Sequence, residues 1–245
     1  MQIMGVAVIR QRLTTSNAGA RHFQWRGGEV TRLEHFSDAV FAFAVTLLVV
    51  SLEVPKSFPE LMAALRGFVA FGVCFAMLVL VWLYHCHFFR RYGLQDGWAT
   101  FLNCVLLFFV LFYVFPLKFL AVAMFVGAEQ INSHDMRTIF IVYGSGYAAV
   151  FLTFALLYLH AWRQRNQLGL NEIERLRTHH ILINHVAMAA VGLGSVLLAL
   201  ALPERRIGLA GYFYLVIGVY FTAAGFTFRR RERRMIQRTA TSAAS

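Results

Sequence analysis

Apolar and polar residues alternate in long blocks along the 245-residue chain. Six apolar runs stand out, at roughly residues 36–54, 61–89, 98–126, 139–162, 181–202 and 207–228. Because an α-helix rises about 1.5 Å per residue, each run is long enough to cross the roughly 30 Å hydrocarbon layer of a bilayer. The pattern therefore predicts an all-α integral membrane protein with six transmembrane helices, which form one domain over residues 31–230.

Arginine placement predicts the orientation of these helices. Both tails and the loops after the second and fourth runs are rich in arginine, whereas the connections on the other side carry few basic residues. Because cytoplasmic segments of membrane proteins are enriched in Lys and Arg, we expect both termini in the cytoplasm, which an even number of crossings also requires. Residues 1–30 and 231–245 are basic, polar and aperiodic, so we expect two mobile tails.

The composition favours a membrane protein over a soluble or nucleic-acid-binding one. Hydrophobic residues make up 59% of the chain and charged residues 14%, against about one quarter charged in soluble domains. The formal net charge of +11 is explained by arginines between the apolar runs, where they set orientation. Cys74, Cys86 and Cys104 lie within apolar runs without a CxxC pattern, which argues against disulfides or a zinc site. We expect no nucleic-acid partner, no cofactor and no bound metal.

The first apolar run has two distinct sides. At 100° per residue, one narrow apolar stripe contains Phe36, Phe43, Leu47, Val50 and Val54. Thr46 lies at the edge of this stripe, and Asp38 lies on roughly the opposite side with Ala42, Val45 and Val49. Because an ionisable group in a membrane needs a partner within the bundle, Asp38 should point into its own subunit. The stripe then faces lipid, another subunit or a pore. A first-turn acid and ordinary helix packing would also explain the two features.

The second and third runs offer partners for this polar edge. Trp82 and His85 are three residues apart and share a helix face, and Asn103 has a similar depth in the next run. We expect Ser37, Asp38, Trp82, His85 and Asn103 to form one hydrogen-bonded cluster near the inner leaflet. The alternative is that a histidine extends to the headgroups beside Arg90, which suits His87 better than His85.

The motif in the first run resembles a known family of channels. The stretch Arg32-x-x-x-Phe36-Ser37-Asp38, followed by AVFAFAVTLL, is similar to the bacterial branch of the transmembrane protein 175 family, a group of potassium-permeable channels. Trp82, His85 and Asn103 fit the same pattern. The specific motifs cover roughly residues 32–116, whereas the last three helices agree only in number and hydropathy.

This resemblance implies a homotetramer with six helices per subunit, in which the first helix of each subunit lines a central pore. It places a hydrophobic constriction at Phe43, Leu47 and Val50, where Phe43 replaces the usual branched aliphatic residue, and a selectivity threonine at Thr46. It also implies a structural polar network of Arg32, Phe36, Ser37, Asp38, Trp82, His85 and Asn103. The expected partners are the other subunits, membrane lipids and permeant potassium ions, in a cell membrane such as the bacterial inner membrane.

Three alternatives stay open at this stage. The histidines at positions 85, 87, 160, 179, 180 and 185 raise the question of a membrane metalloenzyme, although their spacing does not match the clusters that bind iron. Lys118, a charge well inside an apolar run, would suit a proton-coupled transporter or proton pathway. A non-conducting scaffold would also explain the apolar stripe by packing alone.

Overall fold

The computed structural model describes residues 23–50, 56–125, 133–203 and 206–244. Its elements are helices α2 (Arg32–Val50), α3 (Phe58–Tyr92), α4 (Gly97–Phe125), α5 (Ser133–Arg163), α6 (Glu172–Ala201), the short α7 (Leu209–Tyr212) and α8 (Leu215–Ala244). The described residues contain helices and no strands, which confirms the predicted all-α class.

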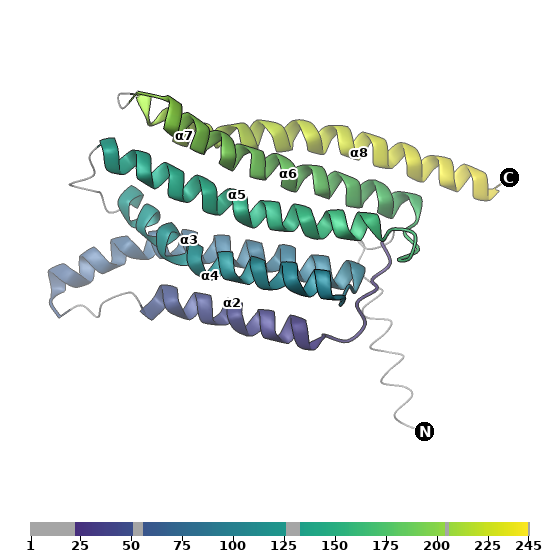
Figure 1. The fold of residues 1–245 in the computed structure, drawn as a ribbon, viewed down its shortest axis with the longest axis horizontal. Coiled ribbons are helices and arrows are strands. Elements are labelled where there is room, and N and C mark those ends of the chain that lie inside the picture. The colour runs from purple at the N-terminus through teal and green to yellow at the C-terminus, as the bar shows by residue number, and fades with distance from the viewer. Residues whose placement is uncertain (1–22, 51–55, 126–132, 204–205, 245) are drawn as a thin grey trace, which may run out of the picture.

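The long helices lie side by side in an elongated bundle (Figure 1). Helix α2 occupies one edge and packs against α3 and α4, while α5 and α6 pack closely in the middle and α8 covers α6 at the far edge. The main core lies between α2, α3, α4 and α5 and includes Leu48, Phe88, Leu106 and Phe154. Helix α2 therefore touches its own subunit on one side only.

Among the described residues, five helical segments are long and apolar enough to cross a membrane: Phe71–Tyr92, Gly97–Pro116, Asp135–Arg163, Glu172–Ala201 and Leu209–Glu232. The first predicted span, in α2, is not among them, because its described part is only 19 residues long and carries Arg32, Glu34 and Asp38 in its first two turns. The chain is therefore an integral membrane protein with five or six spans.

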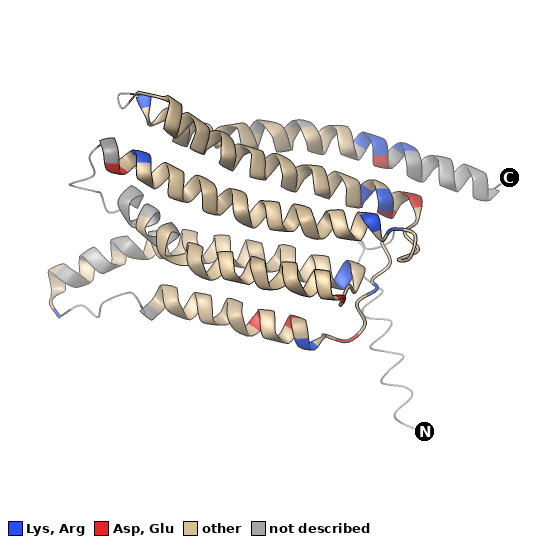
Figure 2. Cartoon of the chain, viewed as in Figure 1, with Lys and Arg blue, Asp and Glu red and all other residues tan. Residues whose placement is uncertain are grey.

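Charged residues gather at one end of the bundle, which contains the start of α2 and the end of α3 (Figure 2). Arg90 and Arg91 lie in the last turn of α3, and Arg163 lies in the last turn of α5. The arginine-rich part of α8 lies at this end as well. The cytoplasmic location of this end remains a prediction from the positive-inside rule.

Local sequence determines where several helices begin. At the start of α2, Thr31 Oγ1 accepts a hydrogen bond from the Glu34 amide (3.2 Å), and the Glu34 carboxylate accepts one from the Thr31 amide (2.9 Å). Asn171 and Glu174 form the same reciprocal arrangement at the start of α6. Such capping boxes satisfy amides that have no partner within the helix. The first helix accordingly begins before the apolar run does.

The predicted mobile N-terminal tail, residues 1–30, is described by the structure only in part. The first described residues contact the bundle: Phe23 is 6% exposed and Arg26 forms a 2.7 Å ion pair with buried Glu174. The Gln24 amide donates a 2.6 Å hydrogen bond to the same carboxylate. A buried carboxylate thus contacts the start of the described segment, while residues 1–22 lie outside the described part of the chain and the mobility of the tail stays a prediction.

The predicted C-terminal tail, residues 231–245, is helical where the structure describes it, and its mobility stays a prediction. Helix α8 continues without a break through Ala244. Its polar part begins with a contact to α6, a 2.6 Å ion pair between Arg177 and Glu232. The apolar part of α8 continues into this ion-paired part without an interruption of the helix.

Glycines allow α5 and α6 to approach closely. A Cβ atom at Gly144 would lie 2.9 Å from the carbonyl oxygen of Gly192, and one at Gly192 would lie 2.8 Å from that of Gly144. Both contacts involve backbone atoms, which cannot move aside as flexible side chains can. Small residues at helix crossings are a common basis of packing in membrane bundles.

Candidate functional site

One face of α2 is fixed against the rest of the subunit. Ser37, Phe41, Ala44 and Leu48 recur every three or four residues and are all buried. This spacing places them on a single side of the helix, and they pack on α3 and α4. The position of α2 is therefore set by the bundle behind it.

A chain of hydrogen bonds ties α2 to α4 and α3. Ser37 Oγ donates to the Leu33 carbonyl oxygen at 2.8 Å and accepts from Asn103 Nδ2 at 2.9 Å. The Asn103 Oδ1 atom is then the acceptor that faces His85 Nε2, 2.8 Å away. His85 Nε2 must therefore carry the hydrogen, which leaves Nδ1 as the unprotonated nitrogen of the neutral ring. All three side chains are at most 1% exposed.

Asp38 makes a separate contact with α3. Its Oδ1 accepts a hydrogen bond of 2.7 Å from Trp82 Nε1. The short distance is typical of a bond to a charged acceptor. The predicted cluster thus appears as two neighbouring groups: one joins Ser37, Asn103 and His85, and the other joins Asp38 to Trp82.

Two members of the predicted network stay outside these groups. Arg32 is exposed, and Phe36 is 56% exposed on the side of α2 that faces away from its subunit. Within the described residues, no hydrogen bond or ion pair is seen between Arg32 and the buried polar groups. The motif therefore combines residues from two faces of the helix.

The opposite face of α2 is open. Phe43 is 57% exposed, and Thr46, Ala39 and Ala42 are exposed beside it. Leu47 is partly buried and packs at the border of the core, and the side chain of Val50 lies outside the described part of the chain. The open face thus centres on Phe43 and Thr46.

The Thr46 hydroxyl is directed by its own helix. Its Oγ1 donates a 2.9 Å hydrogen bond to the carbonyl oxygen of Ala42. Because the hydroxyl hydrogen is used in this bond, the lone pairs of the exposed oxygen are left to face outward. The side chain presents an oxygen acceptor, which is the kind of group that replaces water around a cation.

The other candidate residues are spread over the bundle. His160 Nε2 lies 2.7 Å from Asp96 Oδ2 near the charged end, His180 stacks on Phe228 with ring centroids 4.0 Å apart, and His185 lies among aromatic rings. Among the described residues, no three His, Cys, Asp or Glu side chains come together in a metal-binding arrangement. The Lys118 side chain lies outside the described part.

Sequence reasoning missed the residues that hold the charged end together. Asp96 accepts hydrogen bonds from the Ala99 amide (2.8 Å) and from Gln164 Nε2 (2.9 Å), in addition to its contact with His160. Burial alone would raise the pKa of Asp96, but these hydrogen bonds outweigh it and lower the pKa below the ordinary value. An aspartate one residue before a helix is a recognisable N-terminal signal, although its partners on α5 lie far away in sequence.

The contacts define a class of protein: a helical membrane bundle with an edge helix anchored on one face and open on the other. The family model described as the endosomal/lysosomal potassium channel TMEM175 matches residues 32–116. A curated protein named potassium channel, from Marivirga tractuosa, is 35% identical over 233 residues, which cover 88% of this chain and 94% of that protein. A potassium channel from Chamaesiphon minutus is 31% identical over 143 residues, 55% of this chain and 65% of that protein.

Two solved structures share the fold. A crystal structure of a variant of the potassium channel MtTMEM175, bound to a nanobody–MBP fusion protein, matches with a TM-score of 0.75 at 34% identity and covers 86% of this chain and 98% of that chain. A lysosomal potassium-selective channel TMEM175 homolog from Chamaesiphon minutus matches with a TM-score of 0.53 at 25% identity, covering 82% and 96%. The chain belongs to the TMEM175 family, which confirms the resemblance noted in its sequence.

Proposed function

We propose that this protein is a potassium-permeable channel whose pore is lined by the α2 helices of four identical subunits. The observation that carries the proposal is the two-sided nature of α2. Its buried face is held by Ser37, Phe41 and Leu48, while Phe43 and Thr46 point away from the subunit. The named relatives are potassium channels, and one edge helix cannot enclose a pore, so several copies must assemble.

The proposed gate is a ring of apolar side chains. In a symmetric assembly each exposed residue of α2 recurs once per subunit around the axis, so Phe43 forms a ring of aromatic groups. A narrow apolar ring excludes water and thereby blocks ions without using charge. Leu47 and Val50 extend the proposed constriction along the helix.

The proposed selectivity element is Thr46. Its exposed oxygen lies one turn from Phe43 and accepts rather than donates toward the open side, as argued above from its bond to Ala42. A ring of such oxygens would offer partial replacement for the hydration shell of a permeating cation. The anchored polar groups, including Asp38 and Asn103, then serve to hold α2 in place behind the pore.

The test is electrical recording from purified protein in planar bilayers. We expect unitary potassium currents that follow the electrochemical gradient, with a reversal potential that shifts when the potassium gradient is changed. A flux with fixed proton coupling would instead support the transporter alternative. Reconstituted protein that retains its oligomeric state in the bilayer and yet gives no current would contradict the channel function.

A further inference from the structure

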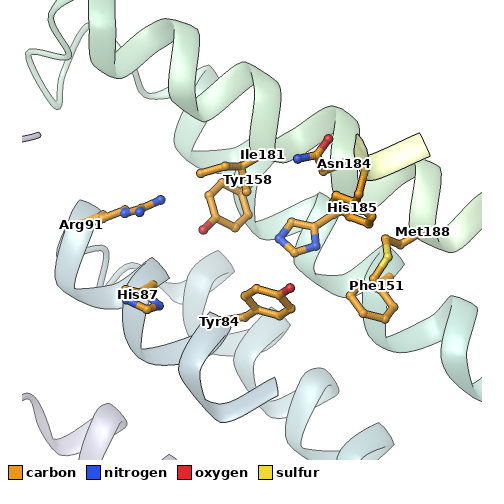
Figure 3. A pocket seen from close by; sticks show the side chains of 10 residues that line it. Tyr84, His87, Arg91, Phe151, Tyr158, Ile181, Asn184, His185 and Met188 are labelled. Carbon is orange, nitrogen blue, oxygen red and sulfur yellow. The ribbon is translucent and has the colours of Figure 1, made fainter. Parts of the chain in front are cut away.

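Two cavities lie end to end inside the bundle, away from the open face of α2. The first, here called the polar cavity, has a volume of about 200 Å³ and is lined by residues of α3, α5, α6 and α8 (Figure 3). The second, the apolar cavity, has a volume of about 190 Å³ and lies between α3, α4, α5 and α6. Phe151 and Met188 line both, so the two cavities adjoin.

Hydrogen-bonding side chains and one cation, Arg91, line the polar cavity. Its lining includes Arg91, His87, Tyr84, Tyr158 and Asn184, and among the described residues it includes no Asp or Glu. The guanidinium carbon of Arg91 lies 5.3 Å from the centre of the Phe23 ring. The guanidinium is directed toward the cavity (Figure 3). This lining is complementary to a negatively charged group that can accept several hydrogen bonds.

A buried imidazole supports the presence of a ligand site. His185 also lines the polar cavity, is only 5% exposed, and its Nε2 has no hydrogen-bond partner among the described residues. Its ring lies 5.1 Å from Tyr158 and 5.5 Å from Tyr84, measured between centroids. Buried polar atoms in proteins are nearly always paired, and a polar group bound beside His185 in this cavity wall would give the nitrogen a partner.

The apolar cavity continues from this site toward the middle of the membrane helices. Its lining is apolar except for the hydroxyls of two tyrosines, and it includes Leu78, Val81, Val110 and Val150. Along α3 the lining changes from Arg91 through Tyr84 to Val81 and Met77, which is a distance of about 21 Å at 1.5 Å per residue. The same order holds along α5, from Tyr158 to Tyr147.

We propose that the two cavities together form a binding site for one phospholipid with a net negative headgroup. The phosphate binds beside Arg91 and His185, and an acyl chain occupies the apolar cavity. Exposed His87 on α3 and Phe221 on α8 flank the opening through which a lipid would enter. A free phosphate would use only the polar half, and an uncharged lipid would leave Arg91 uncompensated. The site does not depend on the proposed pore, because it uses other helices.

The test compares lipid binding by two variants, each of which replaces one of two neighbouring arginines. Arg91→Gln removes the charge from the cavity, whereas Arg90→Gln removes the adjacent charge, which stacks on Trp25 at 4.1 Å and lies outside the lining. Delipidated protein is titrated with phosphatidylglycerol, phosphatidylcholine or glycerol 3-phosphate, and bound ligand is measured by native mass spectrometry and thermal unfolding. We expect Arg91→Gln to bind phosphatidylglycerol about tenfold more weakly and Arg90→Gln to bind it as the wild type does.

A second variant tests the apolar half without touching any charge. Val81→Phe fills part of the apolar cavity and should weaken phosphatidylglycerol binding while the protein still elutes as the folded assembly. Equal losses in Arg90→Gln and Arg91→Gln would overturn the proposal in favour of general surface charge. Equal binding of phosphatidylcholine would overturn its charge selectivity. Glycerol 3-phosphate binding as tight as that of the lipid, with no effect of Val81→Phe, would show a free-anion site instead.

Discussion

At the residue scale, the sequence predicts which polar residues behind α2 lie at the same depth better than it predicts which of them are buried. Ser37, Asp38, Trp82 and Asn103 have spacings that bring them to similar depths on neighbouring helices, and the structure pairs them. Arg32 belongs to the same motif yet is exposed, because a motif of adjacent positions spans more than one side of a helix. Spacing alone therefore indicates which residues are at one depth but not which are buried.

The contact between Asp38 and Trp82 gives a direct test of anchoring. Asp38→Ala leaves the indole N–H of Trp82 without its acceptor, so we expect a loss of about 1–3 kcal/mol in stability and reduced recovery of the assembled oligomer. Thermal unfolding and size-exclusion chromatography measure both effects. In a double-mutant cycle, Trp82→Phe should cost less when Asp38 is already alanine. Strictly additive losses would show that the two side chains do not support each other.

The oxygen of Thr46 can be removed without changing the shape of the side chain. Thr46→Val replaces the exposed hydroxyl with a methyl group, so we expect a lower potassium-over-sodium permeability ratio in a protein that still assembles. Reversal potentials under bi-ionic conditions measure the ratio. Thr46→Ser retains the oxygen and should preserve the selectivity. If Thr46→Val leaves the reversal potential unchanged, Thr46 takes no part in selecting the ion.

At the scale of the element, periodicity predicted two sides of α2 but misplaced the border between them. Ala42 and Val49 were expected on the Asp38 side, facing the subunit, and the structure exposes both. The buried face centres instead on Phe41 and Ala44. A single helix shows which residues lie together, whereas the arc covered by neighbouring helices depends on tertiary packing, which the pattern of one helix does not contain.

The open face of α2 leads to the prediction for the gate. Phe43→Ala removes most of the bulk from the proposed apolar ring, so we expect a several-fold larger cation current with little change in selectivity. Single-channel recording at matched protein levels measures the current. Phe108→Ala is the matched control, because Phe108 is 63% exposed and lies on α4, a helix that the proposal leaves out of the pore lining. Equal currents in the wild type and both variants would exclude Phe43 from the gate.

Asp96, which directly precedes α4, should make the stability of the folded protein depend on pH. The hydrogen bonds to Asp96 lower its folded-state pKa below the ordinary value of 3.8, so its stabilising effect is present above that value and is lost as the pH falls through the folded pKa. We expect Asp96→Asn to lower the melting temperature at about pH 6, and the difference from wild type to shrink as the pH approaches roughly 3. Differential scanning fluorimetry across this range measures the effect. An unchanged difference at low pH would show that the carboxylate charge contributes nothing.

At the scale of the whole molecule, long-range contacts limit what the sequence predicts. Arg26 and Glu174 are 148 residues apart and pair at 2.7 Å, while the segment around Arg26 has no periodicity that would suggest structure. Hydropathy predicted the all-helical class and the approximate spans, because burial in lipid depends on local composition. The contact of this segment with the bundle depends on Glu174, which is distant in sequence and buried in the fold, so local composition could not reveal it.

The open face of α2 also predicts how complete subunits meet. If four copies surround one axis lined by α2, Phe43 of each copy lies close to its symmetry mates, whereas Phe108, exposed on α4, lies off that lining. We expect Phe43→Cys, introduced after the native Cys74, Cys86 and Cys104 are replaced by alanine, to form dimers with a short bismaleimide cross-linker in membranes. Phe108→Cys should remain monomeric under the same treatment, and denaturing gels separate the 27.8 kDa protomer from its dimer. Cross-linking at Phe108 but not at Phe43 would place a different face of the bundle at the axis and remove α2 from the pore.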